Sequence, residues 1–262
     1  MSPLVKNLLA AAVAASLNTA AQAVPPSSYV IDPTQPVAGQ SQLELSQQWW
    51  QWLLGVPAGT NPNFDPDGSS AGVNNDGSVF FLAGNWGGTS TRTVSVPEGR
   101  PVFFPVLNTP YVFTPNEPTI GEACLGPSVP DPVACALPYI DMGAATHPYA
   151  RLDGVDLLTY ATYASYRQTS DSLFVVDLPA DNVFPVLGFP VEAGPHYAVS
   201  DGYWVALAPL ARGQHVLKFG GENGGFTLDV VDILNVPEPP TLMVALSALA
   251  ALALVRRRRA QA

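Results

Sequence analysis

Oxygen-bearing side chains gather in one short stretch of the sequence. Asn63-Phe64-Asp65-Pro66-Asp67-Gly68 alternates asparagine and aspartate before a glycine, as the first half of a calcium loop does. Calcium takes about six to eight oxygen ligands, so Asp65 and Asp67, completed by Asp76, predict a non-standard calcium site. The glutamate of an EF-type loop is replaced by Asn74. Asx and glycine residues also form ordinary turns, and this second interpretation stays open.

Catalytic side chains do not occur in a recognisable pattern. The histidines, His147, His196 and His215, form no His-Glu-x-x-His motif, and the sequence contains no Gly-x-Ser-x-Gly elbow. A catalytic triad or a pair of glycosidase carboxylates is defined by geometry rather than by spacing. We therefore expect a protein without catalytic activity and identify no catalytic residue. A secreted hydrolase acting on polysaccharide or ester substrates is the alternative.

One tryptophan is placed differently from the others. Trp86 lies in Gly84-Asn85-Trp86-Gly87-Gly88, a glycine-rich loop, and we predict that its ring contacts a ligand such as a sugar. Trp49, Trp50 and Trp52 belong to a predicted helix, where core packing is the commoner role of such large rings. A calcium-dependent glycan-binding module is accordingly a second alternative function. No cofactor is expected, with calcium as the open exception.

The helix that carries these tryptophans is the one helix that the exported part of the sequence predicts clearly. Ser41 and Glu44 form a capping box. The apolar residues between Leu45 and Leu53 fall on one face, and Gly55 and Pro57 end the helix. The sequence therefore predicts one N-terminal amphipathic helix.

Most of the remaining sequence favours strands. Short runs rich in β-branched and aromatic residues alternate with Gly, Pro, Asn or Asp, and Asp153-Gly154 indicates a hairpin. This pattern predicts a mainly β fold, an antiparallel β-sandwich of jelly-roll or immunoglobulin-like type. The predicted strands are Ser78–Ala83, Thr91–Val96, Val102–Leu107, Tyr149–Leu152, Val155–Leu158, Leu158–Tyr166, Leu173–Leu178, Tyr197–Leu207, Gln214–Phe219 and Phe226–Leu234.

The N-terminus has the pattern of a secretory signal peptide over residues 1–23. Lys6 supplies the positive charge, Leu8 to Leu17 form an apolar stretch too short to span a bilayer, and Ala21-Gln22-Ala23 is a cleavage site. We expect the mature chain to begin at Val24, after the Sec translocon and signal peptidase have acted. Residues 24–40 are predicted to be a linker and 41–235 a single domain.

The C-terminus, residues 236–262, has three parts in order: Val236-Pro237-Glu238-Pro239, an uncharged stretch from Thr241 to Val255, and Arg256-Arg257-Arg258-Arg259. The uncharged stretch would be about 22 Å long as a helix, short for a bilayer core of about 30 Å. Arginines stay on the cytoplasmic side of a membrane. The sequence therefore predicts a short transmembrane helix that orients the preceding domain outward.

This tail resembles the PEP-CTERM sorting signal of Gram-negative bacteria. The resemblance implies recognition by an exosortase, cleavage near Val236 to Pro239, and release to the cell surface or extracellular matrix of a bacterium that forms biofilm and secretes exopolysaccharide. A plain tail anchor is the alternative. Exopolysaccharide is an open further partner.

Export also bears on the cysteines and the charges. Cys124 and Cys135 are the only cysteines, and an even number in an oxidising compartment predicts a disulfide. Without Lys6, the four terminal arginines and Glu238, the chain keeps 6 basic and 20 acidic residues, a net charge of −14. Such a domain should repel nucleic acid, which we exclude as a partner.

The exported domain also resembles a family of uncharacterised secreted bacterial proteins. No activity is established for that family, so the resemblance implies no catalytic residue. The matching stretches are Trp49-Trp50-Gln51-Trp52, Asn61-Pro62, Phe80-Phe81-Leu82-Ala83-Gly84, Val96-Pro97, Phe103-Phe104-Pro105, Asp201-Gly202-Tyr203-Trp204 and Gly213-Gln214-His215.

Overall fold

The computed structural model describes residues 25–114, 124, 128–158 and 162–237. The predicted signal peptide with Ala21 and Ala23 lies outside the described residues, as do Glu238, Pro239, the apolar stretch and the arginine cluster. None of the helices in the described ranges is long and apolar enough to cross a membrane.

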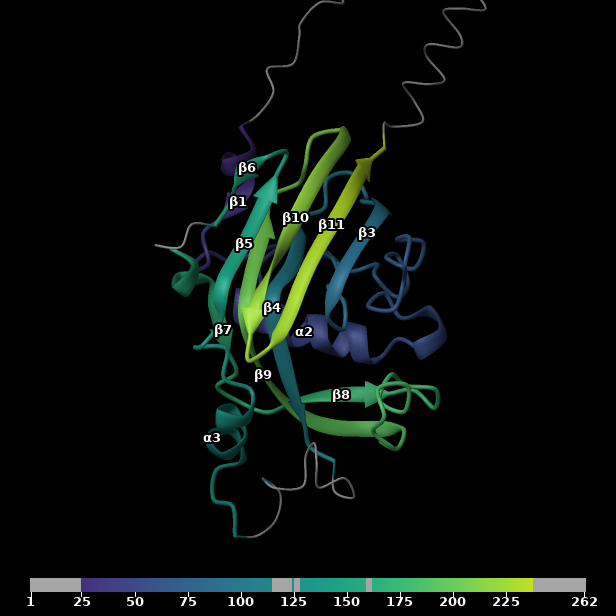
Figure 1. Ribbon diagram of the computed structural model, residues 1–262, viewed down its shortest axis with the longest axis vertical. Coiled ribbons are helices and arrows are strands. Elements are labelled where there is room, and N and C mark those ends of the chain that lie inside the picture. Colours follow the sequence, from purple (N-terminus) through teal and green to yellow (C-terminus); the bar gives the residue numbers. More distant parts are fainter. Residues whose placement is uncertain (1–24, 115–123, 125–127, 159–161, 238–262) are drawn as a thin grey trace, which may run out of the picture.

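Two β-sheets form the body of the protein (Figure 1). The first sheet has the order β1 (Val30–Ile31), β9 (Gly194–Leu207), β4 (Val102–Val112) and β2 (Phe80–Phe81), with β7 (Arg167–Thr169) and β8 (Phe174–Leu178) also paired to β9. The second sheet has the order β3 (Gly88–Ser95), β11 (Phe226–Val236), β10 (Gly213–Asn223), β5 (Thr146–Leu152) and β6 (Val155–Asp156).

The strand directions differ in part from the prediction. Most pairs are antiparallel, but β3 runs parallel to β11 and β2 runs parallel to β4. Alternation of apolar and polar residues reports which face of a strand is buried and not which way its neighbour runs. The mainly β fold with two sheets is therefore confirmed, whereas a purely antiparallel arrangement is wrong. The jelly-roll or immunoglobulin-like type stays a prediction.

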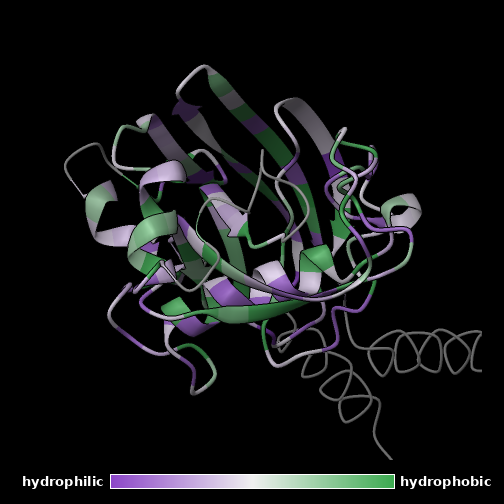
Figure 2. Ribbon diagram, turned by 90° about the horizontal axis from the view of Figure 1, so that it is seen from below, coloured by the Kyte–Doolittle hydropathy of each residue, from purple (hydrophilic) through white to green (hydrophobic). Residues whose placement is uncertain are grey.

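The main core lies between the two sheets. Phe104 of β4 meets Phe219 of β10 with ring centroids 4.9 Å apart, and the inward residues of β9 and β11 complete the cluster. Along β11 every second residue is buried, so the other face of the second sheet is in water. Figure 2 shows the resulting alternation of hydrophobic and hydrophilic residues along the strands.

The first sheet is covered on its second face as well. Helix α2 (Gln42–Leu54) packs there, and Trp49 meets Trp204 of β9 with ring centroids 5.3 Å apart. The capping box predicted for Ser41 and Glu44 is present. Burial on both faces explains why the first six residues of β4, beginning at Val102, are all buried, as in a strand between two layers.

Two local features differ from what the sequence suggested. The segment 24–40, predicted to be a linker, contains η1 (Pro26–Tyr29) and β1, whose Val30 pairs with Leu207, and Tyr29 is buried. Within the predicted strand Leu158–Tyr166, Tyr163–Tyr166 forms the 3₁₀ helix η5. Its aromatic residues suggested a strand, but Tyr163 instead packs on the ring of Tyr203 in the first sheet.

The smaller elements are helical. They are η2 (Ala58–Thr60), α3 (Pro132–Ala136) and η4 (Leu137–Tyr139). The predicted disulfide between Cys124 and Cys135 is present, with the two Cα atoms 5.6 Å apart. Cys124 is fully buried against Tyr111 and Phe113, so the disulfide fastens α3 to the end of β4.

Removal of this disulfide should lower stability moderately. For a sequence separation of 11 residues, loop closure predicts a loss of about 2–3 kcal/mol in the free energy of unfolding for Cys124→Ala/Cys135→Ala. Urea unfolding of the purified protein, with and without a reductant, measures this loss. A wild-type midpoint that does not change on reduction would contradict the prediction.

Candidate functional site

A buried ion pair joins two neighbouring strands of the second sheet. Arg92 of β3 and Asp232 of β11 face inward at paired positions, and Arg92 Nε donates to Asp232 Oδ1 at 2.9 Å. The two side chains are 3% and 0% exposed. Burial raises the pKa of Asp232, and the charge and hydrogen bonds of Arg92 oppose that rise.

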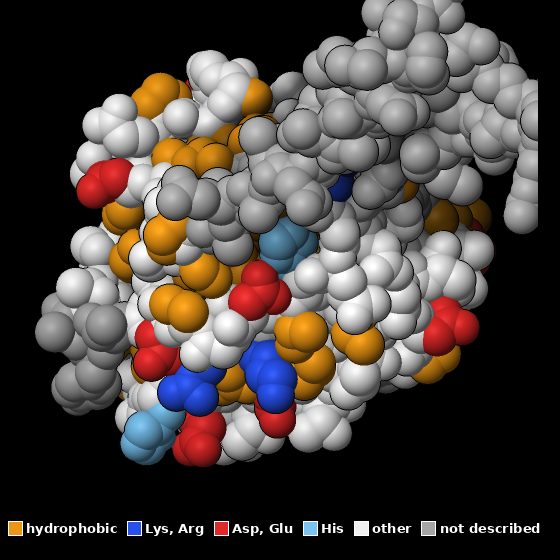
Figure 3. All heavy atoms as spheres, turned by 90° about the horizontal axis from the view of Figure 1, so that it is seen from above, with side chains coloured by type: hydrophobic (Ala, Val, Ile, Leu, Met, Phe, Trp, Pro, Cys, Tyr) orange, Lys and Arg blue, Asp and Glu red, His pale blue; other side chains and the backbone are white. Residues whose placement is uncertain are grey.

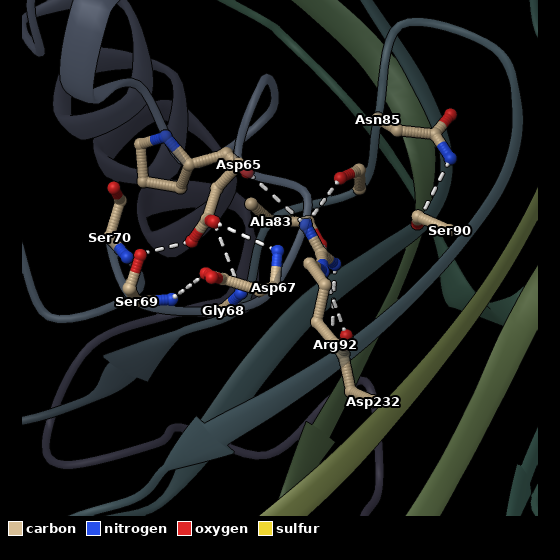
Figure 4. A network of polar contacts seen from close by, with 12 residues as sticks. Asp65, Asp67, Gly68, Ser69, Ser70, Ala83, Asn85, Ser90, Arg92 and Asp232 are labelled. Atoms are coloured by element: carbon tan, nitrogen blue, oxygen red, sulfur yellow. Dashed lines mark hydrogen bonds and ion pairs between the residues drawn. The ribbon is translucent and has the colours of Figure 1, made fainter.

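The remaining N–H groups of Arg92 hold the backbone of residues 62–84 (Figure 4). Nη1 donates to the carbonyl oxygens of Pro62 and Gly84, and Nη2 donates to that of Ala83 and to Asp232 Oδ2. An arginine side chain has five N–H donors, and all of them are thus used. Both ends of the loop region 62–84 are thereby fixed to one guanidinium group.

The aspartates of the predicted calcium loop stabilise turns. Asp65 accepts hydrogen bonds from the backbone N–H groups of Asp67, Gly68 and Ser70, so its oxygens stabilise a turn (Figure 4). Asp67 accepts from the Ser69 N–H, and its hydrogen bonds with Ser69 lower its pKa.

In the part of the chain that the structure describes, no three His, Cys, Asp or Glu residues gather to hold a metal ion. Asp76 is exposed, and its charge acts on Arg100. The structure thus agrees with the turn interpretation, and calcium binding by Asp65, Asp67 and Asp76 stays a prediction.

Both ring nitrogens of His196 and of His215 are engaged, whereas His147 is exposed. His215 bonds Asp153 through Nδ1 at 2.8 Å and the Ala211 carbonyl through Nε2 at 2.9 Å. His196 bonds two backbone carbonyls, at 3.1 and 3.0 Å. A general base of a triad needs its second nitrogen free for a nucleophile, so neither ring is placed as one.

A cavity of about 310 Å³ opens beside Trp86. Its wall combines aromatic rings with amides, and it draws on α2, the loop after it, β4, the segment after η4, and the β10–β11 hairpin. The lining residues are Trp50, Asn63, Asn85, Trp86, Asn108, Thr109, Pro110, Tyr139, Ile140, Asp141, Met142, Asn223, Phe226 and Leu228. We call this cavity the amide–indole pocket.

Four buried polar atoms in this wall have no hydrogen-bond partner among the described residues: Trp50 Nε1, Asn63 Oδ1, Trp86 Nε1 and Asn108 Nδ2. Trp50 is 2% exposed and Asn63 is 8% exposed. Leaving such a group unpaired costs about 1–3 kcal/mol, so native proteins pair almost all of them. The four residues that carry these atoms line one cavity, which makes this cavity the candidate binding site.

A second, more apolar cavity of about 430 Å³ adjoins the amide–indole pocket. The two share Trp86, Tyr139 and the Thr109-Pro110 corner of β4, and the second continues towards Phe184 and Phe189. The rings of Trp86 and Phe64 are tilted by 43° to each other, with centroids 5.7 Å apart. The ring of Trp86, predicted to contact a ligand, thus stands between two cavities.

A polar network centred on Asp201 and Arg167 fixes one wall of the pocket. Asp201 of β9 is buried and accepts from Arg167 Nε at 2.9 Å, from Thr169 Oγ1 at 2.7 Å and from the Met142 N–H at 2.7 Å. Arg167 also donates to Asp141. The hydrogen bond with Asp201 raises the pKa of Arg167 above its ordinary value. Hydrogen bonds from the Gly143 N–H, the larger effect, and from Arg167 lower the pKa of Asp141.

The described residues on the face shown in Figure 3 form no basic patch. In Figure 3 the clearly visible Lys and Arg side chains lie beside Asp or Glu side chains. Arg212 with Glu98 and Arg151 with Asp156 are exposed pairs of this kind. Basic residues are thus neutralised locally, as expected for an acidic domain.

The fold and the pocket define a two-sheet β protein with a polar, aromatic-lined cavity. Residues 235–259 match the model of the PEP-CTERM protein-sorting motif. Searches against curated proteins and solved structures gave no match. The sorting signal is therefore confirmed, whereas the resemblance of the domain to an uncharacterised secreted family has no support from a homologue.

The Arg92–Asp232 pair should be essential for the fold. Arg92→Met leaves a buried carboxylate and three carbonyl oxygens without their donor, and we expect a loss of about 3–5 kcal/mol in the free energy of unfolding. The matched control is Arg151→Met, whose exposed pair with Asp156 should contribute less than about 1 kcal/mol. Chemical denaturation of both variants measures the difference, and equal losses would contradict the assignment.

Proposed function

We propose that the protein is exported through the Sec translocon, trimmed by signal peptidase after Ala23, and held briefly in the inner membrane by its tail. An exosortase then cleaves near Pro237-Glu238-Pro239 and releases the domain that begins at Val24 to the cell surface or extracellular matrix of a Gram-negative bacterium. There the domain is a non-catalytic, biofilm-associated protein that contacts exopolysaccharide. The match to the PEP-CTERM motif is the observation on which this proposal rests.

The fold supports cleavage directly after the domain. Strand β11 ends at Val236, which is buried and paired with Gly213, and Pro237 is exposed. β11 is bonded on both sides, to β10 and to β3, so cleavage before Val236 would require a central strand to leave the sheet. Pro237, the first proline of Pro237-Glu238-Pro239, therefore lies where the sheet no longer protects the backbone.

The position of the ends supports a brief membrane attachment. Figure 1 shows that the described chain enters through η1 and leaves through β11 at the same end of the molecule. A domain tethered at this end can fold without the tail crossing its surface. Backbone carbonyls occupy a ring nitrogen of His196 and of His215, which supports the non-catalytic assignment.

Loss of the motif should block release. In cells that contain an exosortase, we expect Glu238→Ala to accumulate as the intact chain in the membrane fraction. The wild type should appear outside the cell, beginning at Val24 and ending beyond Val236. Mass spectrometry of the membrane and medium fractions measures both.

The control is Pro240→Ala, which lies next to Pro237-Glu238-Pro239 and should be processed normally. Normal release of Glu238→Ala would show a signal that acts without the motif. A wild-type protein found intact in the cytosol, with Cys124 and Cys135 reduced, would contradict export itself.

A further inference from the structure

We infer that the amide–indole pocket binds a neutral sugar unit of a polysaccharide directly, without a metal ion. This inference deepens the proposed function and rests on it for the biological source of the sugar. It is carried by the chemistry of the unpartnered atoms in the pocket wall and by the aromatic rings beside them.

The unpartnered groups define what the ligand must offer. Trp50 Nε1, Trp86 Nε1 and Asn108 Nδ2 are donors, whereas Asn63 Oδ1 is an acceptor. A ligand that satisfies them needs several acceptor oxygens and at least one O–H or N–H donor within a small volume. Sugar hydroxyls provide both, and the acetamido group of an N-acetylhexosamine provides one of each.

The aromatic residues supply the second half of sugar recognition. Trp86, Tyr139 and Phe226 line the same pocket, and Tyr139 and Phe226 belong to the exposed large hydrophobic residues. A pyranose ring has an apolar C–H face that packs against such rings while its hydroxyls stay at the rim. An apolar ligand would leave the four polar atoms unpaired, so the composition of the wall disfavours it.

Charge selects a neutral ligand. The carboxylate in the wall, Asp141, is held by Arg167, and Arg167 in turn is shared with buried Asp201. None of the described lining residues is a lysine, an arginine or a histidine. In a domain with a large negative charge, a uronate would meet repulsion without a compensating cation.

The position of the pocket fits a protein that is first tethered and then released. Phe226 at the start of β11 lines the pocket, and Val236 at its end precedes the sorting motif. Ten residues of strand span roughly 33 Å. The pocket therefore lies well away from the tethered end and is accessible before and after cleavage of the tail.

The indole N–H resonances of the wild-type protein provide the first test. The full chain, labelled with ¹⁵N in a detergent that has no sugar headgroup, is titrated with N-acetylchitotriose, with cellotriose and with trigalacturonate. We expect saturable shifts of the Trp50 and Trp86 resonances with one or both neutral trisaccharides. Trp49 and Trp52 should not shift, because their indoles already donate to Leu82 O and Val73 O at 2.8 Å.

Binding constants of variants provide the second test. Trp86→Phe keeps a ring and loses the N–H, and we expect binding about threefold weaker, whereas Trp86→Ala loses both and should bind at least about tenfold weaker. The matched control is Tyr197→Ala, which removes a ring that is 56% exposed and lies outside both cavities. Calorimetry on the same full-length samples should give its wild-type affinity.

Several results would overturn the inference. They are the absence of shifts with both neutral trisaccharides, binding of trigalacturonate alone, loss of binding on addition of a chelator, or equal weakening by Tyr197→Ala. The assay does not depend on processing, because it uses the uncleaved chain. Failure of sugar binding with normal release would leave the sorting proposal intact, and failure of release with normal binding would leave the pocket assignment intact.

Discussion

The ion pair between Arg92 and Asp232 is the constraint on which the arrangement of the second sheet and the pocket depends. A buried ion pair is a weak source of net stability, because both charges lose their hydration. It is a strong source of specificity, since sliding β3 against β11 by one residue would turn Arg92 to the solvent and leave Asp232 buried alone. The same guanidinium group holds the carbonyls of Pro62, Ala83 and Gly84, and the residues next to these, Asn63 and Asn85, line the pocket.

The three tryptophans of α2 differ in whether the indole N–H has a hydrogen-bond partner among the described residues. Trp49 and Trp52 fill the layer between α2 and the first sheet, and each indole N–H has a backbone carbonyl at 2.8 Å. Trp50 is equally buried, but its N–H lines a cavity and has no partner in the described ranges. Trp204 also lacks one, yet it lies stacked on Phe103 inside the core and lines neither cavity. Burial of a polar atom thus indicates a ligand site only where a cavity adjoins it.

Local patterns predicted the parts of the fold that are decided locally. The capping box of α2, the Asp153-Gly154 hairpin and the alternating strands β3 and β11 follow from neighbouring residues. The disulfide followed from cysteine number and compartment. Strands β1 and β7 were missed because they are short and are stabilised by pairing with β9, a partner distant in sequence. The same limit hid the pocket, since Trp50, Asn63 and Asn108 come from separate segments, and Asn63 was interpreted as part of a calcium loop.

Strand β11 connects the two functional ends of the molecule. Its first residue, Phe226, contributes to the pocket, its middle carries Asp232, and its last residue, Val236, adjoins the sorting motif. Because β11 is a central strand, it is ordered as far as Val236 only when β3 and β10 are paired on either side of it. Formation of the whole sheet therefore determines the residue at which the folded domain ends and the free tail begins. A chain whose second sheet is unfinished would lack both the ordered pocket and a defined boundary for cleavage, so folding, the proposed ligand binding and the proposed release all involve the same strand.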